Sequence, residues 1–179
     1  MSSLPLHPLI VHTPVTLLIV SLVFELVGRA LDAEWWRRAA VALLVIGTLG
    51  AAAAVITGNA AGDAAEHQGV ADSPLEQHED AGKLTLGFAI GAVVVRALAA
   101  RPGPLRAPAG ALALALQVAA AILVGVAGYR GGRLVYEHAA GVRVHGVLVG
   151  TDRAPGAAER PPSAASPART AARASSSPR

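Results

Sequence analysis

Four long apolar runs, separated by short polar segments, dominate the hydropathy pattern of the chain. They cover about residues 8–31, 39–57, 83–100 and 108–128, and each is close to the roughly 20 residues that cross a bilayer as a helix. A backbone in lipid must satisfy its own hydrogen bonds, so these runs predict helices. The predicted fold class is all-α, an integral membrane four-helix bundle over residues 1–149.

Local signals refine where these helices begin and end. Ser73-Pro74-Leu75-Glu76 is a capping box with proline at the first helical position, which extends the third helix back to about residue 74. Gly58 suits a C-cap for the second helix, and Gly131-Gly132 follow the fourth span. Pro14 breaks a regular helix that starts at Pro8, so irregular backbone is expected around His12.

The C-terminal segment, residues 150–179, has a different composition. It is rich in Ala, Pro, Ser and Arg and has neither periodicity nor aromatic residues, so it is predicted to be disordered. At the other end, no basic segment or small-residue cleavage site accompanies the first apolar run. That run is therefore expected to be a retained span and not a cleaved signal.

Composition supports a membrane protein and narrows the possible chemistry. Only 15% of residues are charged, whereas soluble domains carry about 25%. The net charge is +3, but the arginines gather at span ends and in the tail without interleaved aromatic residues, so no nucleic-acid partner is expected. The absence of cysteine excludes disulfides, thiolate metal sites, covalently attached haem c and cysteine-ligated iron–sulfur clusters within this chain.

The distribution of basic residues predicts the orientation in a bacterial inner membrane. The first connection between spans holds Arg29, Arg37 and Arg38, and the third holds Arg96, Arg101 and Arg106. Residues 58–82, between the second and third spans, contain six acids and no Lys or Arg. The positive-inside rule then places both termini and this acidic segment outside, although the arginine-rich tail runs against that assignment.

Polar residues and small residues inside the spans predict helix contacts. Glu25 and Arg29 are four residues apart on one helical face, so an ion pair with the arginine reaching outward is expected. Gln117 is expected to make an interhelical hydrogen bond. Gly47 with Ala51, and Gly50 with Ala54, have the four-residue spacing of small residues that lets helices approach closely.

All six histidines fall on the predicted outer side of the bundle. Imidazole both titrates near neutral pH and readily ligates metals, so this distribution suggests a cofactor site. The residues concerned are His7, His12, His67, His78, His138 and His145.

Several of these residues carry a family resemblance. Residues 6–14, Leu-His-Pro-Leu-Ile-Val-His-Thr-Pro, resemble the opening of a bacterial membrane family, domain of unknown function 2231, which has a His-Pro…Val-His-Phe-Pro pattern and four spans. Thr57-Gly58, the His78 region and residues 131–138 resemble its later motifs. Thr13 stands where an aromatic residue is usual, and Ala139-Ala140 where Gly-Val is usual, which changes packing beside the histidines but not the histidines themselves.

The resemblance, which covers roughly residues 4–145, implies membrane redox chemistry only indirectly. The family has no settled activity, but similar domains occur in chains that also carry Rieske-type or cytochrome c domains.

The predicted cofactor ligands are His12, His78 and His138, because they come from three elements that emerge at the same face. Six-coordinate haem b takes two imidazoles from separate elements, so haem b is the leading cofactor. A transition metal (zinc, copper or iron) takes three or four ligands, for which His7, His145 and Glu79 are second-tier candidates. Each histidine also has a simpler interpretation as a solvated boundary residue, in which case no cofactor binds.

Three functions follow from these alternatives. The leading one is a small membrane redox module that exchanges electrons with membrane or periplasmic redox proteins and does not make or break bonds in a substrate. The second is a metal-ion handling or transport protein, and the third is a cofactor-free membrane interaction module. The sequence contains no nucleophile elbow, zinc-protease motif or phosphate-binding glycine loop.

Overall fold

A computed structural model of the chain describes residues 6–66, 72–140, 142–144 and 147–148. The predicted disordered tail, residues 150–179, lies outside the described residues. So do His67 and His145.

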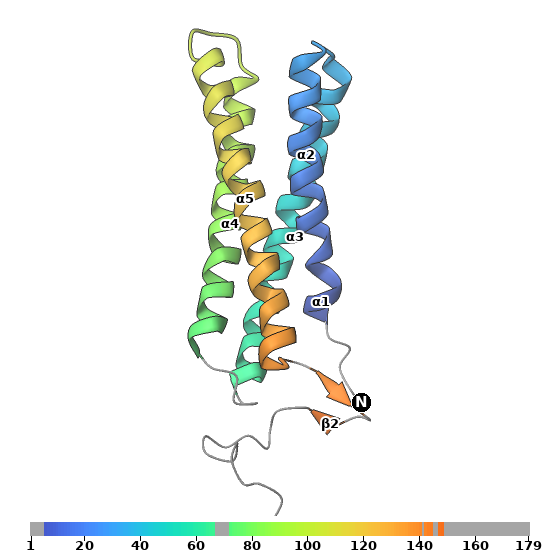
Figure 1. Cartoon of the computed structure of the whole chain (residues 1–179). Helices are drawn as coiled ribbons and strands as arrows, with labels where there is room; N and C mark the ends of the chain where they lie inside the picture. The colour runs from blue at the N-terminus through green and yellow to red at the C-terminus, as the bar shows by residue number, and fades with distance from the viewer. Residues whose placement is uncertain (1–5, 67–71, 141, 145–146, 149–179) are drawn as a thin grey trace, which may run out of the picture.

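The described chain is almost entirely helical (Figure 1). Its elements are α1 (Leu6–Ile10), α2 (His12–Ala30), α3 (Glu34–Glu66), α4 (Asp72–Ala99), α5 (Arg106–His138), β1 (Arg143–Val144) and β2 (Val147–Leu148). The two short strands pair antiparallel, and α1 leads directly into α2. Four helical segments are long and apolar enough to cross a membrane, which confirms the predicted all-α four-span architecture.

The four long segments form two antiparallel hairpins that stand side by side (Figure 1). The first hairpin pairs α1 and α2 with α3, and the second pairs α4 with α5. One end of the bundle carries Leu6, Glu66, Asp72 and His138, and we call it the histidine end. The opposite end carries the two connections within the hairpins, and we call it the arginine end.

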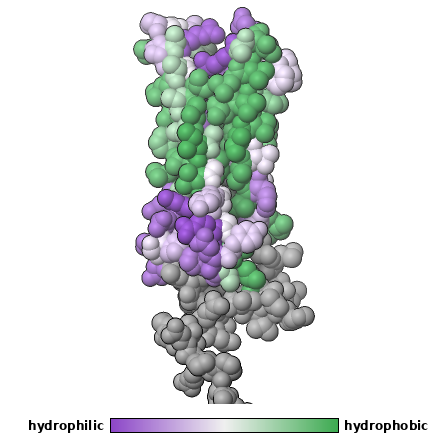
Figure 2. Space-filling model, in the orientation of Figure 1, coloured by the Kyte–Doolittle hydropathy of each residue, from purple (hydrophilic) through white to green (hydrophobic). Residues whose placement is uncertain are grey.

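The interior is built mainly from small side chains, so the helices pack closely. The central buried cluster consists of Leu18, Leu44, Ala89, Ala92, Ala120 and Val124. A Cβ at Gly47 would lie 3.0 Å from the Leu18 side chain, which confirms the predicted close approach at that glycine. On the face shown in Figure 2, the surface is apolar between two polar ends, as a lipid-facing belt requires.

Helix α2 starts irregularly, as Pro14 predicts. The helix is interrupted at Val11, and Pro14, which is buried, has no N–H to bond the carbonyl of Ile10. Helix α4 begins at Asp72, close to the predicted start near residue 74.

Two predicted helix ends are wrong. Gly58 lies inside α3, which continues to Glu66, and Gly131-Gly132 lie inside α5, which continues to His138. Gly58 and Gly131 are needed where an imidazole ring packs directly on the helix backbone, so they serve a close approach and not a helix end. The turn that does end α5 is at Ala139, which has a left-handed conformation with φ of 53°.

Candidate functional site

Two histidine rings from different hairpins meet at the histidine end. The ring centroids of His7, on α1, and His78, on α4, are 6.1 Å apart, and the ring planes are inclined at 86°. Both side chains are half-buried. Among the described residues, His7 and His78 are the two histidines whose rings contact each other.

The two rings are held in the same way. His7 Nδ1 lies 3.0 Å from the carbonyl oxygen of Ala54 and 3.3 Å from Thr57 Oγ1, and His78 Nδ1 lies 3.0 Å from the carbonyl oxygen of Ala127. A carbonyl oxygen only accepts, so Nδ1 carries the proton and donates in both rings. In the neutral imidazole, Nε2 then keeps its lone pair, which is the arrangement found in metal-ligating histidines.

A glycine lies under each ring, one helical turn after the residue whose carbonyl anchors it. A Cβ at Gly58 would lie 3.1 Å from His7 Cε1, and a Cβ at Gly131 would lie 3.0 Å from His78 Cε1. These distances are tighter than ordinary van der Waals contact, so any larger residue would displace the ring. The glycines therefore fix how deeply each imidazole sits in the bundle.

The other predicted ligands lie elsewhere. His12 is exposed, and its Nδ1 lies 2.8 Å from the carbonyl oxygen of Pro8 in the preceding turn. His138 is the half-buried last residue of α5. Glu79 Oε2 accepts from Lys83 Nζ at 3.0 Å, and His145 lies outside the described residues.

Of the three predicted ligands, only His78 has a ring contact with another histidine among the described residues, and that histidine is His7. The trio of His12, His78 and His138 stays a prediction. Among residues 6–63, 72–140 and the short strands, no group of three or more His, Asp or Glu side chains is placed to hold one metal ion.

A second polar cluster lies in the interior toward the arginine end. The Glu25 side chain is fully buried, and its Oε1 accepts from Arg29 Nε at 2.6 Å and from Arg96 Nη1 at 2.8 Å. The predicted pair of Glu25 with Arg29 is confirmed. Arg96, on α4, was expected only as a flanking positive charge, but its side chain is only 17% exposed and reaches the same carboxylate.

Hydrogen bonds extend this cluster to a third helix. Arg96 Nη2 donates to Gln117 Oε1 at 3.3 Å, Gln117 Nε2 donates to Ser21 Oγ at 2.9 Å, and Ser21 donates to the carbonyl of Leu18. The predicted interhelical role of Gln117 is confirmed. Glu25 forms ion pairs with both arginines, although Glu25 Oε2 and Arg96 Nε have no hydrogen-bond partner among the described residues, and the cluster joins α2, α4 and α5.

The sequence does contain a signal for Arg96. Arg96 follows His78 by the same number of residues as Glu25 follows His7. That equal spacing places both charges at matching heights on α4 and α2, where they can meet.

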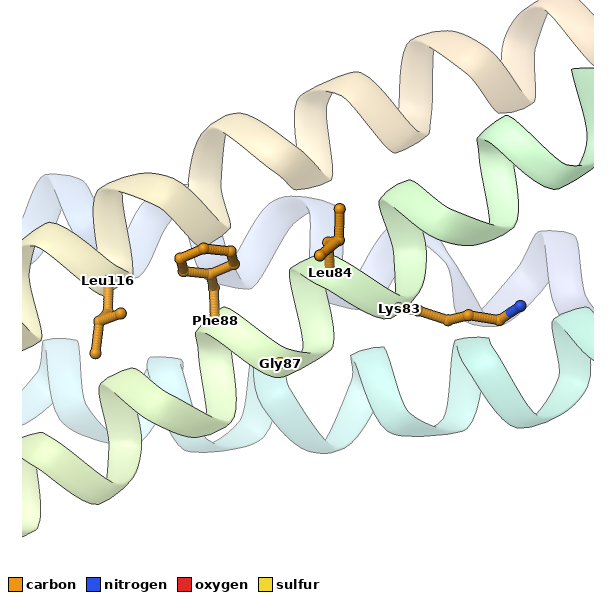
Figure 3. A pocket seen from close by; sticks show the side chains of 5 residues that line it. All are labelled: Lys83, Leu84, Gly87, Phe88 and Leu116. Carbon is orange, nitrogen blue, oxygen red and sulfur yellow. The ribbon is translucent and has the colours of Figure 1, made fainter.

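A hollow lies on the flank of α4 and α5. It measures about 260 Å³ and is lined by Lys83, Leu84, Gly87, Phe88 and Leu116 (Figure 3). The walls are apolar, and the Lys83 side chain extends away from Phe88 and Leu116. Because the hollow opens on the apolar belt, lipid chains can fill it, and Lys83 is the one polar side chain among its lining residues.

Comparison with known proteins places these features in a family. The family described as "Predicted membrane protein (DUF2231)" matches residues 3–144, which include both histidine rings and the whole buried cluster. No curated protein matches the chain, and no solved structure matches it either.

Proposed function

The chain belongs to the DUF2231 family of predicted membrane proteins, and from that premise we propose that it is a small membrane redox module in which His7 and His78 hold haem b at the outer face. Its surroundings are the lipid bilayer, and its partners are membrane or periplasmic redox proteins. Haem, when bound, supplies one-electron chemistry, so the module transfers electrons and is not a bond-making catalyst.

The separation of the two rings carries this proposal. Imidazoles bind metal ions through nitrogen at about 2 Å, so two imidazoles that held one iron would have ring centroids about 6 Å apart. The centroids of His7 and His78 are 6.1 Å apart. Each Nδ1 is engaged by a carbonyl, which leaves each Nε2 as the available ligand atom.

The number of ligands favours haem over a bare ion. Haem iron takes four nitrogens from the macrocycle and needs only two from the protein, whereas protein sites for zinc use three or four side chains. The two rings come from separate hairpins, so binding would tie the hairpins together at the histidine end. At Gly58 and Gly131 the rings pack directly on the helix backbone, so the glycines fix the depth of each imidazole in the bundle.

The test is the absorbance of the protein purified in detergent from cells supplied with haem precursor. We expect about one haem per chain and a reduced-minus-oxidised difference spectrum typical of haem b. His7→Ala and His78→Ala should abolish it, whereas His12→Ala and His138→Ala should keep it. Loss in the latter two variants would favour the trio of ligands expected from the sequence, and wild-type protein without haem after loading would refute the proposal.

A second candidate, metal-ion handling, is supported by one additional observation. Glu79 directly follows His78, and its Oε1 faces Gly62 of α3, where a Cβ would lie only 2.6 Å away. This places a carboxylate at the same end of the bundle as the two imidazoles, in a zone rich in acids. A colourless protein that binds zinc, copper or iron stoichiometrically, and loses it in His7→Ala and His78→Ala, would favour this candidate. A colourless and metal-free protein would favour the cofactor-free interaction module.

A further inference from the structure

The buried faces of α2 and α4 follow the same register. Each buried position of α2 has a counterpart in α4 at the offset that separates Glu25 from Arg96, 71 residues. All the counterparts are buried except Arg96, which is 17% exposed. The pairs are Pro14 and Thr85, Leu18 and Ala89, Ser21 and Ala92, Glu25 and Arg96, and Gly28 and Ala99.

The second helices of the two hairpins match as well. Helices α3 and α5 are each 33 residues long, and five buried positions of α3 correspond to five buried positions of α5 at one constant offset. These pairs are Ala40 and Ala113, Leu44 and Gln117, Gly47 and Ala120, Ala51 and Val124, and Ala54 and Ala127.

The polar contacts obey the same two offsets. His7 and His78 are counterparts, and so are their anchoring residues, Ala54 and Ala127, and the glycines beneath the rings. Helices α2 and α4 start at the same end of the bundle, so the hairpins are related by a pseudo-two-fold axis along it (Figure 1). Equivalent residues meet each other only near such an axis, as His7 meets His78 and Glu25 meets Arg96.

We infer that the chain is an internal duplication of one helical hairpin, and that Glu25 and Arg96 make each hairpin pair with the unlike hairpin and not with the like hairpin of a second copy. Pairing of two first hairpins would bring Glu25 against Glu25, each with only the more exposed Arg29 of its own helix as a counter-charge, and pairing of two second hairpins would bring Arg96 against Arg96 without a buried carboxylate. Like charges in a buried site are strongly unfavourable, whereas the native pair is compensated. This inference is independent of any cofactor.

The inference is tested with two full-length chains. In each chain, the residues at positions 25 and 96 carry charge of the same sign. Glu25→Arg gives a chain with two arginines at the axis, and Arg96→Glu gives a chain with two carboxylates. Expressed alone, each should accumulate poorly or unfold at a temperature roughly 10 °C or more below that of the wild type. Co-expressed with different tags, they should co-purify as a one-to-one complex, because opposite charges then meet only between chains.

Two companions complete this test. The double variant Glu25→Arg/Arg96→Glu should regain most of the stability within a single chain. As a matched control, the exposed pair Arg133 and Glu137 is changed in the same way, with Arg133→Glu and Glu137→Arg expressed together, and should give no co-purification. Single variants as stable as wild type, or a stable double variant without co-purification of the singles, would overturn the inference.

Pairing of like hairpins can be read directly because the chain contains no cysteine. Leu18 is buried near the axis, so Leu18→Cys should form a disulfide between chains only when two first hairpins pair. We expect this cross-link in the neutral variant Glu25→Gln/Arg96→Gln and not with native charges. A cross-link with native charges, or none in the neutral variant, would show that the charges do not choose the partner.

Discussion

Glu25 and Arg96 form an ion pair between the two hairpins, with Arg96 Nη1 2.8 Å from Oε1 of a carboxylate that is wholly shielded from solvent. Removing a charge from water and placing it within a membrane-spanning bundle is costly, so each partner depends on the other. The pair joins the hairpins toward the arginine end, as His7 and His78 join them at the histidine end.

The two arginines that contact Glu25 should contribute unequally to stability. Arg96→Gln leaves a buried carboxylate poorly compensated and should lower the free energy of unfolding by about 3–5 kcal/mol. Arg29 is 39% exposed, so Arg29→Gln should cost about 1 kcal/mol or less. Unfolding in mixed detergent and SDS micelles measures both, with the exposed Arg133→Gln as control. Equal losses for Arg29→Gln and Arg96→Gln would contradict this picture.

Substitution of the glycine beneath His78 should be disruptive, whereas substitution of its neighbour should not. A Cβ at Gly131 would lie 3.0 Å from His78 Cε1, whereas a Cβ at Gly132 meets no atom within 4 Å. Alanine normally favours a helix over glycine by about 1 kcal/mol, so Gly132→Ala should be neutral or stabilising. Gly131→Ala should displace the ring and change the histidine NMR shifts, and any bound haem should show an altered spectrum. Identical behaviour of the two variants would mean that the ring is not seated on this backbone.

The hydrogen bond between Gln117 and Ser21 should be measurable as a coupling energy. Gln117 Nε2 donates to Ser21 Oγ across two helices in a fully buried position. A double-mutant cycle with Gln117→Leu and Ser21→Ala should give about 0.6–1.7 kcal/mol, the range found for hydrogen bonds between membrane helices. Additive effects of the two substitutions would indicate that the bond contributes nothing.

Orientation can be tested by labelling single cysteines in intact cells. Tyr136 is 90% exposed at the histidine end, and Leu105 is 75% exposed at the arginine end. The basic residues around the arginine end predict that it faces the cytoplasm. A membrane-impermeant maleimide should therefore label Tyr136→Cys in intact cells and Leu105→Cys only after permeabilisation. The opposite pattern would place the histidines in the cytoplasm.

The architecture and part of the buried cluster could be predicted because they depend on local patterns. Hydropathy defines four spans, and the four-residue spacing of Glu25 and Arg29 on one helix predicts their contact. The sequence predicts an interhelical hydrogen bond for Gln117 because a polar amide within lipid needs a partner. The partner of Glu25 on α4 depends on how two hairpins dock, which a local pattern does not contain.

The histidine pair shows the same limit, although its signal was present. The sequence favours His12 because it lies beside irregular backbone, but His12 is exposed. His7 lies seven residues before Pro14, about two helical turns, and so continues the buried face of α2. Tracing that face back to the start of the chain would have ranked His7 above His12.

The length of α3 and α5 constrains the direction in which the proposed module could transfer electrons. Each has 33 residues, which at about 1.5 Å per residue is roughly 50 Å, whereas the hydrocarbon layer is about 30 Å thick. For the proposed haem site, this excess length would place His7 and His78 near the aqueous border, within reach of a water-soluble electron donor or acceptor. Along the helices, roughly 27 Å separates His7 from the level of Glu25. A single haem site at the histidine end would therefore transfer electrons between partners on one side of the membrane. Electron transfer across the membrane would require a second redox site.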